Sequence, residues 1–348
     1  MRRAVAAILV CAWAAAAARA EDPSRSSAAF ARLPLGARAP ALGGGTAAID
    51  AEATAAVANP AGLATLDPAA MGLFHTGFLP GGESELHAAV AGWVTPELVV
   101  GVAIFSRNLG EVEFRQANTL TPGSVEQASA QVYTGALGAR LFPALDVGAS
   151  FRYLQESVGY LFASGFSADG GLLYRPWPRV SAALVARDLP GTSFGWHTTG
   201  SAVAGGSDNL DRSLVLGAAV DLNPVLVVLQ ADSPSDDARH VSGGVEWDIH
   251  PAFTFRAGLR DGLFATGFGA RAVVGKWYGV RLDYAFARSP VGGVAFEHRF
   301  ALTLAWLDWR VKRDRLLFPT EEEVARPDSP GWLRPSRRPV PLFTWPDL

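Results

Sequence analysis

Residues 145–153 read LDVGASFRY, and their side chains alternate between two kinds with a period of two. The odd positions are apolar or aromatic, and the even positions carry Asp146, Gly148, Ser150 and Arg152. This alternation is typical of a β-strand with two unlike faces. Residues 241–249 and 278–286 repeat the pattern. The sequence therefore predicts an all-β fold.

The pattern continues from about residue 71 to residue 306, with turn residues between the strands. We predict fourteen strands, at residues 71–79, 84–94, 97–107, 129–141, 145–156, 165–175, 179–189, 212–222, 225–232, 239–250, 252–260, 264–275, 278–287 and 295–306. Every second connection is short and mostly marked by proline, whereas the connections at 108–128 and 190–211 are long. Transmembrane barrels have this arrangement, with short turns at one rim and longer loops at the other.

Alternation alone does not say which face lies inside. A soluble barrel or sandwich turns its apolar face inward, and a membrane barrel turns it toward lipid. Five tryptophans fall at the short-turn end and would form an aromatic girdle, since indole suits a membrane interface. They are Trp93, Trp177, Trp247, Trp277 and Trp306. The sequence thus predicts a transmembrane antiparallel β-barrel, at residues 71–306.

In such a barrel the charged side chains of the strands line the lumen. The predicted lumen charges are Asp146, Arg152, Glu246, Asp248, Arg256, Arg281, Asp283, Glu297 and Arg299. Opposite charges on neighbouring strands pair across a sheet, so we interpret them as pairs that stiffen the barrel and hold a plug. A ligand path is the alternative.

The N-terminus has the features of a secretory signal peptide. Two arginines precede an apolar run at residues 4–18, and the small residues Ala18 and Ala20 suit a cleavage site. We predict a cleaved signal peptide at residues 1–20, with an N-terminal membrane anchor as the alternative. The single cysteine, Cys11, lies within it, so the mature chain has neither disulfides nor thiol chemistry. Export and the barrel pattern together predict the outer membrane of a Gram-negative bacterium.

Residues 307–348 follow the last strand and are rich in proline and charge, so they can neither extend the sheet nor bury a core. An even number of strands places both ends of the barrel on the periplasmic side. We predict a periplasmic tail, either a solvated linker or a segment whose aromatic residues bind the rim or a periplasmic partner.

Residues 21–70 have a composition unlike that of a strand in lipid. Residues 35–48 read LGARAPALGGGTAA, and residues 59–63 read NPAGL. Glycines permit close backbone packing, residues 46–57 favour a short helix, and Pro60 disfavours its continuation past Ala58. We predict a hatch inside the barrel. Its key residues are Gly43, Gly44, Gly45, Asn59, Pro60, Ala61, Gly62 and Leu63.

GARA at residues 36–39, the glycine cluster, an acidic spacer and NPAGL together resemble the N-terminal signature of the PorV/PorQ family, relatives of the FadL-type outer-membrane transporters. DYAF at 283–286 and HRFALTL at 298–304 resemble the closing hairpin of that family. The resemblance implies a fourteen-stranded barrel with an N-terminal hatch. It also implies one of two activities, carriage of secreted proteins to a surface attachment complex or passage of hydrophobic compounds.

Other classes of function lack the residues they require. A formal net charge of −3 excludes strong general affinity for nucleic acid. The histidines show no metal-site spacing, and neither a nucleophile elbow nor a phosphate-binding loop is present, so we expect no enzyme, metal or cofactor. We expect an accessory of protein secretion or surface attachment, with outer-membrane lipid and secreted proteins as partners. The alternatives are a FadL-like transporter of hydrophobic compounds such as long-chain fatty acids, and a structural envelope protein.

Overall fold

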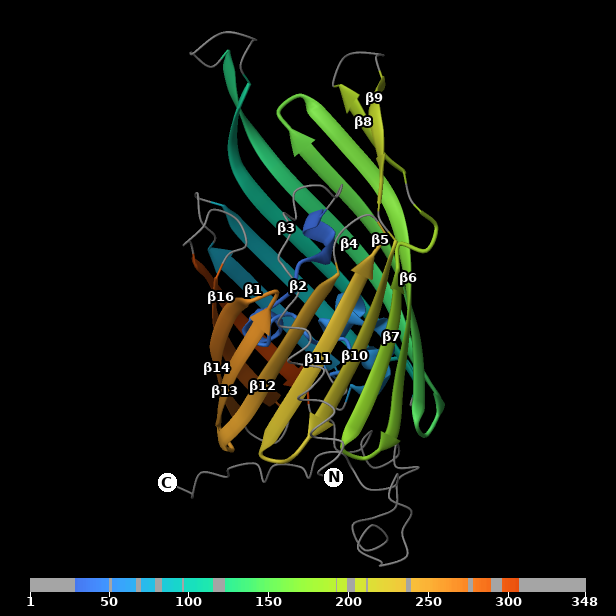
Figure 1. Cartoon of the computed structure of the whole chain (residues 1–348), viewed down its shortest axis with the longest axis vertical. Coiled ribbons are helices and arrows are strands. Elements are labelled where there is room, and N and C mark those ends of the chain that lie inside the picture. The colour runs from blue at the N-terminus through green and yellow to red at the C-terminus, as the bar shows by residue number, and fades with distance from the viewer. Residues whose placement is uncertain are drawn as a thin grey trace, which may run out of the picture.

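A computed structural model of the chain describes residues 29–49, 52–66, 70–78, 83–95, 97–114, 123–191, 193–198, 204–210, 212–235, 239–274, 278–288 and 296–306. The predicted signal peptide and the predicted tail at 307–348 lie outside these residues, as does Trp277. The described strands form a single antiparallel sheet that curves into a tall barrel (Figure 1).

The sheet contains sixteen strands. They are β1 (Ala70–Phe78), β2 (Ser84–Trp93), β3 (Leu98–Phe114), β4 (Ser124–Phe142), β5 (Leu145–Val158), β6 (Leu161–Trp177), β7 (Val180–Arg187), β8 (Ser193–Thr198), β9 (Ala204–Asn209), β10 (Ser213–Asp221), β11 (Val225–Pro234), β12 (His240–His250), β13 (Phe253–Arg260), β14 (Leu263–Val274), β15 (Tyr278–Arg288) and β16 (Phe296–Trp306).

Fourteen of these strands make the wall of the barrel. Neighbours in the chain pair with each other, β1 also pairs with β16, and β7 pairs with β10. The remaining two strands, β8 and β9, form a hairpin that pairs with the upper part of β6. The predicted transmembrane antiparallel barrel of fourteen strands is confirmed, and most strand limits agree with the prediction to within about two residues.

The apolar face of the wall turns outward. Along β5, the Phe151 side chain is 56% exposed whereas its neighbour Arg152 is 1% exposed. The same contrast holds on β15, where Leu282 is 58% exposed and Asp283 5%. An outer surface of this kind is stable in lipid, because it leaves no charge in the hydrocarbon region.

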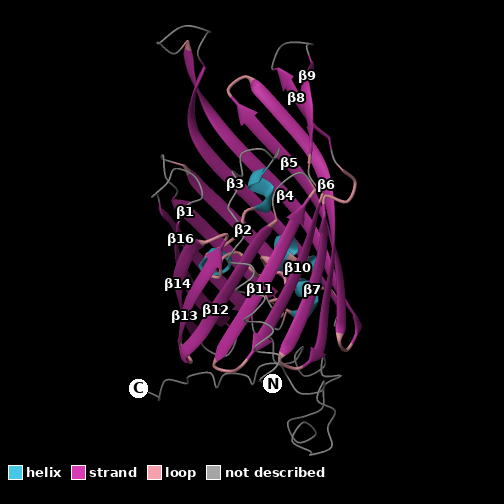
Figure 2. Cartoon of the chain, in the orientation of Figure 1, coloured by secondary structure: helices cyan, strands magenta, loops and turns pink. Residues whose placement is uncertain are grey.

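The two long connections were predicted as loops, and this is wrong for part of each. β3 continues as far as Phe114, and β4 already begins at Ser124. The connection after β7 contains β8 and β9. These extensions rise above the rest of the barrel on one side (Figure 2). They carry charged residues such as Glu111 and Glu113, but these alternate with Val112 and Phe114, so the period of two continues into the part that was predicted as a loop.

Residues 29–49 and 52–66, which belong to the predicted hatch segment, lie inside the barrel (Figure 1). They form four short helices, η2 (Ala29–Arg32), α2 (Arg38–Ala41), α3 (Ala55–Ala58) and η3 (Pro60–Thr65). α2 packs against β13, β14 and β15, and η3 packs against β3, β4, β5 and β6. The hatch thus spans the lumen from one side of the wall to the other. No described helix has the length and apolar character needed to cross a membrane.

The predicted short helix at 46–57 begins later than expected, because the α-helix covers only Ala55–Ala58, and it ends at Ala58 before Pro60 as predicted. Side chains of the wall replace the missing helical hydrogen bonds. The backbone N–H of Ala47 donates to Gln230 Oε1 over 3.0 Å, and the Ser181 hydroxyl donates to the Ala48 carbonyl over 2.7 Å. Backbone polar groups satisfied in this way do not require a helix.

Candidate functional site: the hatch, its charge ring and the adjoining cavity

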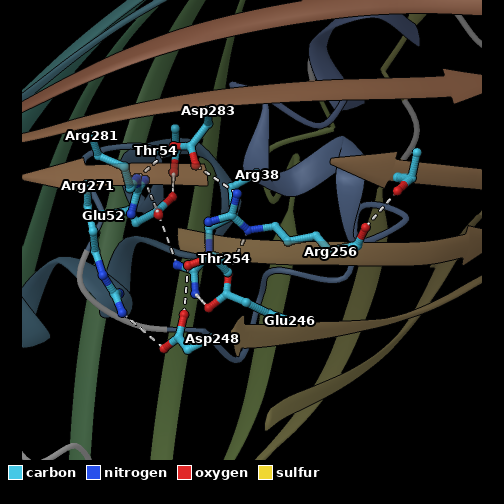
Figure 3. Close-up of polar contacts among 11 residues, drawn as sticks. Arg38, Glu52, Thr54, Glu246, Asp248, Thr254, Arg256, Arg271, Arg281 and Asp283 are labelled. Carbon is cyan, nitrogen blue, oxygen red and sulfur yellow. Dashed lines mark hydrogen bonds and ion pairs between the residues drawn. The ribbon is translucent and has the colours of Figure 1, made fainter. Parts of the chain in front are cut away.

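Six buried charges join the hatch to the wall and form a closed chain of ion pairs (Figure 3). We call this the charge ring. Its members are, in order, Arg38, Glu52, Arg281, Asp283, Arg256 and Glu246. The first two belong to the hatch, and the other four belong to β15, β13 and β12.

The hatch half of the ring is held by four contacts, one of which is the hydrogen bond from Arg38 Nη2 to Glu246 Oε1 over 2.8 Å. Arg38 Nε donates to Glu246 Oε2 over 2.6 Å, and Arg38 Nη1 donates to Glu52 Oε1 over 2.9 Å. Arg281 Nη2 reaches the same Glu52 oxygen at 2.5 Å. Each hatch charge therefore contacts the wall directly.

The wall half closes the ring. Arg281 Nε lies 2.6 Å from Asp283 Oδ2, Arg256 Nη1 lies 2.7 Å from Asp283 Oδ1, and Arg256 Nε lies 2.8 Å from Glu246 Oε2. Three cations and three anions alternate, so their formal charges cancel. Apart from Arg281, at 21% exposure, the side chains are at most 12% exposed. Buried charges are tolerated only when paired in this way.

The hatch charges have altered pKa values. Burial alone would raise the pKa of the Glu52 carboxyl, but the nearby guanidinium groups of Arg281 and Arg38 outweigh burial and lower it to about 2. The Arg38 guanidinium is also penalised by burial, yet Glu246 and Glu52 hold its pKa well above the ordinary value. Both groups are therefore charged at neutral pH.

The low pKa of Glu52 predicts how docking of the hatch depends on pH. The folded value, about 2, lies below the ordinary value of 4.5, so the ionised carboxylate stabilises the docked hatch fully above pH 4.5. This contribution is lost as the pH falls from 4.5 through 2. Hydrogen exchange of residues 52–66, corrected for intrinsic rates, should show constant protection from pH 7 to 5 and lower protection below pH 4. Loss of protection already between pH 7 and 5 would contradict the assignment.

Glycines of the predicted cluster let the hatch turn against the wall. Gly43 and Gly44 have φ values of +69° and +89°, which L side chains rarely adopt. On the wall side, a Cβ at Gly138 of β4 would lie 2.7 Å from the Cβ of Leu63 and from the carbonyl oxygen of Pro60. Glycine is therefore needed on both sides of the contact.

Asn59 fixes the start of η3 and ties it to the wall. Its Oδ1 accepts from the backbone N–H of Ala61 over 3.1 Å, and its Nδ2 donates to the carbonyls of Ala47 over 2.8 Å and Leu172 over 3.2 Å. Pro60 then begins the helix, where its missing N–H has no cost. The NPAGL stretch thus caps η3 and anchors it to the wall, and all five of its residues are buried.

Replacing Asn59 with Ala is expected to destabilise the hatch, because the substitution removes a cap and the side-chain donor to the buried Ala47 carbonyl. The expected loss is about 1–3 kcal/mol. Thermal unfolding in detergent measures it, with Asn108→Ala as control, since the exposed Asn108 side chain caps a bulge of β3 and not a helix of the hatch. Equal melting temperatures for both variants would contradict the role given to Asn59.

The predicted tryptophan girdle is wrong at one position. Trp93 is turned toward the lumen, packs against the hatch and donates from Nε1 to the Leu66 carbonyl over 2.9 Å. It is therefore a contact of the hatch and not of lipid. The structure places the other described members on the outer face at the short-turn end, where Trp177 is 65%, Trp247 46% and Trp306 52% exposed.

All nine predicted lumen charges face inward, and those outside the ring form separate clusters. Asp146 pairs with Arg140 at 3.1 Å and Arg175 at 2.5 Å. The remaining pairs are Arg152 with Asp169 and Asp188, Arg299 with Glu85 and Glu297, and Asp248 with Arg271. Within the described part of the chain, no group of His, Cys, Asp and Glu is arranged to hold a metal ion.

A partly open cavity of about 40 Å³ lies between the hatch and the wall. Its hatch side includes Leu33, Leu35 and Val57, and its wall side is formed by β7, β11, β12 and β13. By its volume it holds a few water molecules or one small group of a ligand. The sequence did not reveal this cavity, because its two sides are about 130 to 230 residues apart in the chain.

These observations define a class of protein: a membrane-spanning β-barrel whose lumen is occupied by its own N-terminal hatch. No protein-family model matches the chain, and no curated protein matches it. Among solved structures, the toluene transporter TbuX of Ralstonia pickettii is similar, with 14% identity, a TM-score of 0.56, and coverage of 80% of this chain and 98% of that one.

Two further structures share the fold. The CymD monoaromatic hydrocarbon channel has 14% identity and a TM-score of 0.55, covering 79% of this chain and 97% of that one. A FadL homologue of Pseudomonas aeruginosa has 9% identity and a TM-score of 0.54, covering 75% of this chain and 95% of that one. The fold is thus that of FadL-type barrels, whereas the more specific resemblance to PorV/PorQ proteins finds no support among these structures.

Proposed function

We propose that the chain is a non-enzymatic transporter of hydrophobic small molecules in the outer membrane of a Gram-negative bacterium. The observation that carries the proposal is the combination of a hatch-filled lumen with a cavity between hatch and wall. The similar structures are named as a toluene transporter, a monoaromatic hydrocarbon channel and a FadL homologue, which supports the same function here. The role in protein secretion, expected from the PorV/PorQ resemblance, has no comparable support.

The geometry of the hatch favours selective passage over an open aqueous pore. The charge ring and the wall glycines hold the hatch across the lumen, so a solute must pass beside it. The charges of the ring satisfy one another, and we assign them to holding the hatch. This leaves the cavity as the place where a ligand meets the hatch.

Uptake by whole cells tests the proposal. Cells that lack their own hydrocarbon transporter and express the full chain should take up radiolabelled toluene or oleate several times faster than cells with an empty vector. Uptake of arabinose should be unchanged, because a small sugar would enter only through an aqueous pore. No increase for either hydrophobic compound, or an equal increase for arabinose, would overturn the proposal.

A further inference from the structure

An open groove of about 660 Å³ crosses the outer face of the wall and is bordered by β13 to β16 and β2. Two rows of outward side chains line it. The upper row pairs in register across three strands and comprises Phe268, Tyr284 and Phe300. The lower row lies two residues nearer the short-turn rim and comprises Ala270, Leu282 and Leu302. Because its lining is apolar and aromatic, the groove suits an acyl chain of a membrane lipid.

Directly above the upper row, a histidine faces outward where the strand pattern calls for an apolar residue. His298 is exposed, and its Nδ1 lies 2.9 Å from the Tyr284 hydroxyl oxygen. The rings of Tyr284 and Phe286 lie beside it, at centroid distances of 6.2 and 5.2 Å. A Tyr284 hydroxyl that donates to Nδ1 leaves the ring proton on Nε2, which then donates outward. These contacts hold a polar group in place on the lipid-facing surface.

A second basic group lies one step higher on the same face. Arg288 is the last residue of β15, pairs in register with Phe296 and is exposed. The acidic residues of β15 and β16 are Asp283 and Glu297, and both are buried on the lumen side. The outer face of these two strands therefore carries basic groups and no carboxylate of its own.

The positions of these groups along the strands place them at the upper edge of the apolar band. Strands in such barrels rise about 3.3 Å per residue and tilt by about 40°. His298 is eight residues from Trp306 at the short-turn rim, and Phe296, the register partner of Arg288, is ten. They therefore lie about 20 and 25 Å above Trp306, in a band about 25 Å tall. The headgroups of the extracellular leaflet begin at this level.

We propose that this surface binds one molecule of lipopolysaccharide, the anionic lipid of the extracellular leaflet. A phosphate of its lipid A contacts Arg288 and His298, and an acyl chain lies in the groove beneath Tyr284. Guanidinium and imidazole N–H groups donate well to phosphate oxygens. The inference rests on the outer-membrane location within the proposed function, and it does not depend on which solute the barrel transports.

Native mass spectrometry of the purified full chain in detergent measures the binding, because a bound lipid adds its own mass. Diphosphoryl lipid A is expected to bind as a single molecule, at least tenfold more tightly than lipid A stripped of both phosphates. Phosphatidylglycerol should also bind more weakly, because its single phosphate cannot engage both basic groups from separate positions. Equal binding of the stripped lipid, or of phosphatidylglycerol, would overturn the assignment to lipopolysaccharide.

A paired variant locates the headgroup. Arg288→Ala combined with His298→Ala removes both basic groups and should lower the affinity for diphosphoryl lipid A at least tenfold. The matched control combines Arg212→Ala with His197→Ala, at exposed residues beside β10 and on β8, which do not border the groove. An unchanged affinity in the first variant, or an equal loss in the control, would overturn the assignment of these residues.

A second variant tests the groove. Ala270→Trp fills part of the lower row, so it should also lower the affinity for lipid A severalfold. Ala182→Trp is its control, because Ala182 is exposed on the outer face of β7, away from the groove. Melting temperatures of both variants verify that the barrel is intact. Lipid A binding that Ala270→Trp leaves unchanged would contradict the place given to the acyl chain.

Uptake of toluene by whole cells separates this inference from the transporter function. If the wild-type chain takes up toluene but does not bind lipid A, the transporter function stands and the lipid site is wrong. If the chain binds lipid A with the expected preference but takes up neither toluene nor oleate, the lipid site stands and the transporter function is wrong.

Discussion

Replacing Arg38 with Met is expected to release the hatch from the wall. The substitution keeps most of the side-chain volume but leaves Glu246 and Glu52 with one cation fewer in a buried ring. Removing one partner of a buried ion pair typically costs about 3–5 kcal/mol, because the remaining charge is uncompensated. Hydrogen exchange of residues 38–65 should show protection falling by a factor of 100 or more, while the strands stay protected.

The matched control is Arg271→Met. Arg271 lies on the same part of the wall, 3.2 Å from Asp248, but its side chain is 29% exposed and belongs to no described contact with the hatch. A partly exposed pair contributes about 1 kcal/mol or less, so protection of the hatch should barely change. If the two variants behave alike, the charge ring does not hold the hatch.

A Gly138→Val substitution is expected to displace η3. The new side chain would occupy the space that Leu63 and the Pro60 backbone now fill, and these atoms cannot move without separating the hatch from β4. Overpacking of this kind costs about 1–3 kcal/mol and more where backbone must shift. The expected results are a lower melting temperature and faster hydrogen exchange in residues 59–66.

Gly135→Val on the same strand provides the control. Position 135 faces outward, and a Cβ there meets no atom within 4 Å. Both variants add the same side chain to β4, and they differ only in the face that it occupies. A loss of hatch protection in Gly135→Val as large as in Gly138→Val would mean that the effect arises in the strand and not at the hatch.

The strands of the barrel could be predicted because lipid and lumen impose opposite chemistry on alternate residues. The same rule could have placed Trp93 correctly. Leu86 and Val90 of β2 are exposed outward, so the even positions face lipid and Trp93 falls on the inner face. The prediction considered only how far along the barrel Trp93 lies. It did not consider that Trp93 is an odd position of β2, on the face opposite to lipid. The strands above the apolar band were missed because each long connection was interpreted as a loop over its whole length, although the alternation continues at residues 111–114 and 193–197.

The charge ring could be predicted only in part. Parity places Glu246 and Asp283 on the inner face, but their pairing depends on where the hatch lies. Arg38 and Glu246 are 208 residues apart, and no local pattern relates them. From the sequence one sees only that the hatch segment contains an arginine and an acidic residue, Arg38 and Glu52. The partners of these two residues follow only from the docked structure.

The central claim, that the hatch closes the lumen of the barrel, is tested most directly by single-molecule conductance in a planar bilayer at neutral pH. The purified wild-type chain should show no steady ion current, whereas Arg38→Met should show channel openings as its hatch detaches. A steady porin-like current through the wild-type chain would contradict the claim.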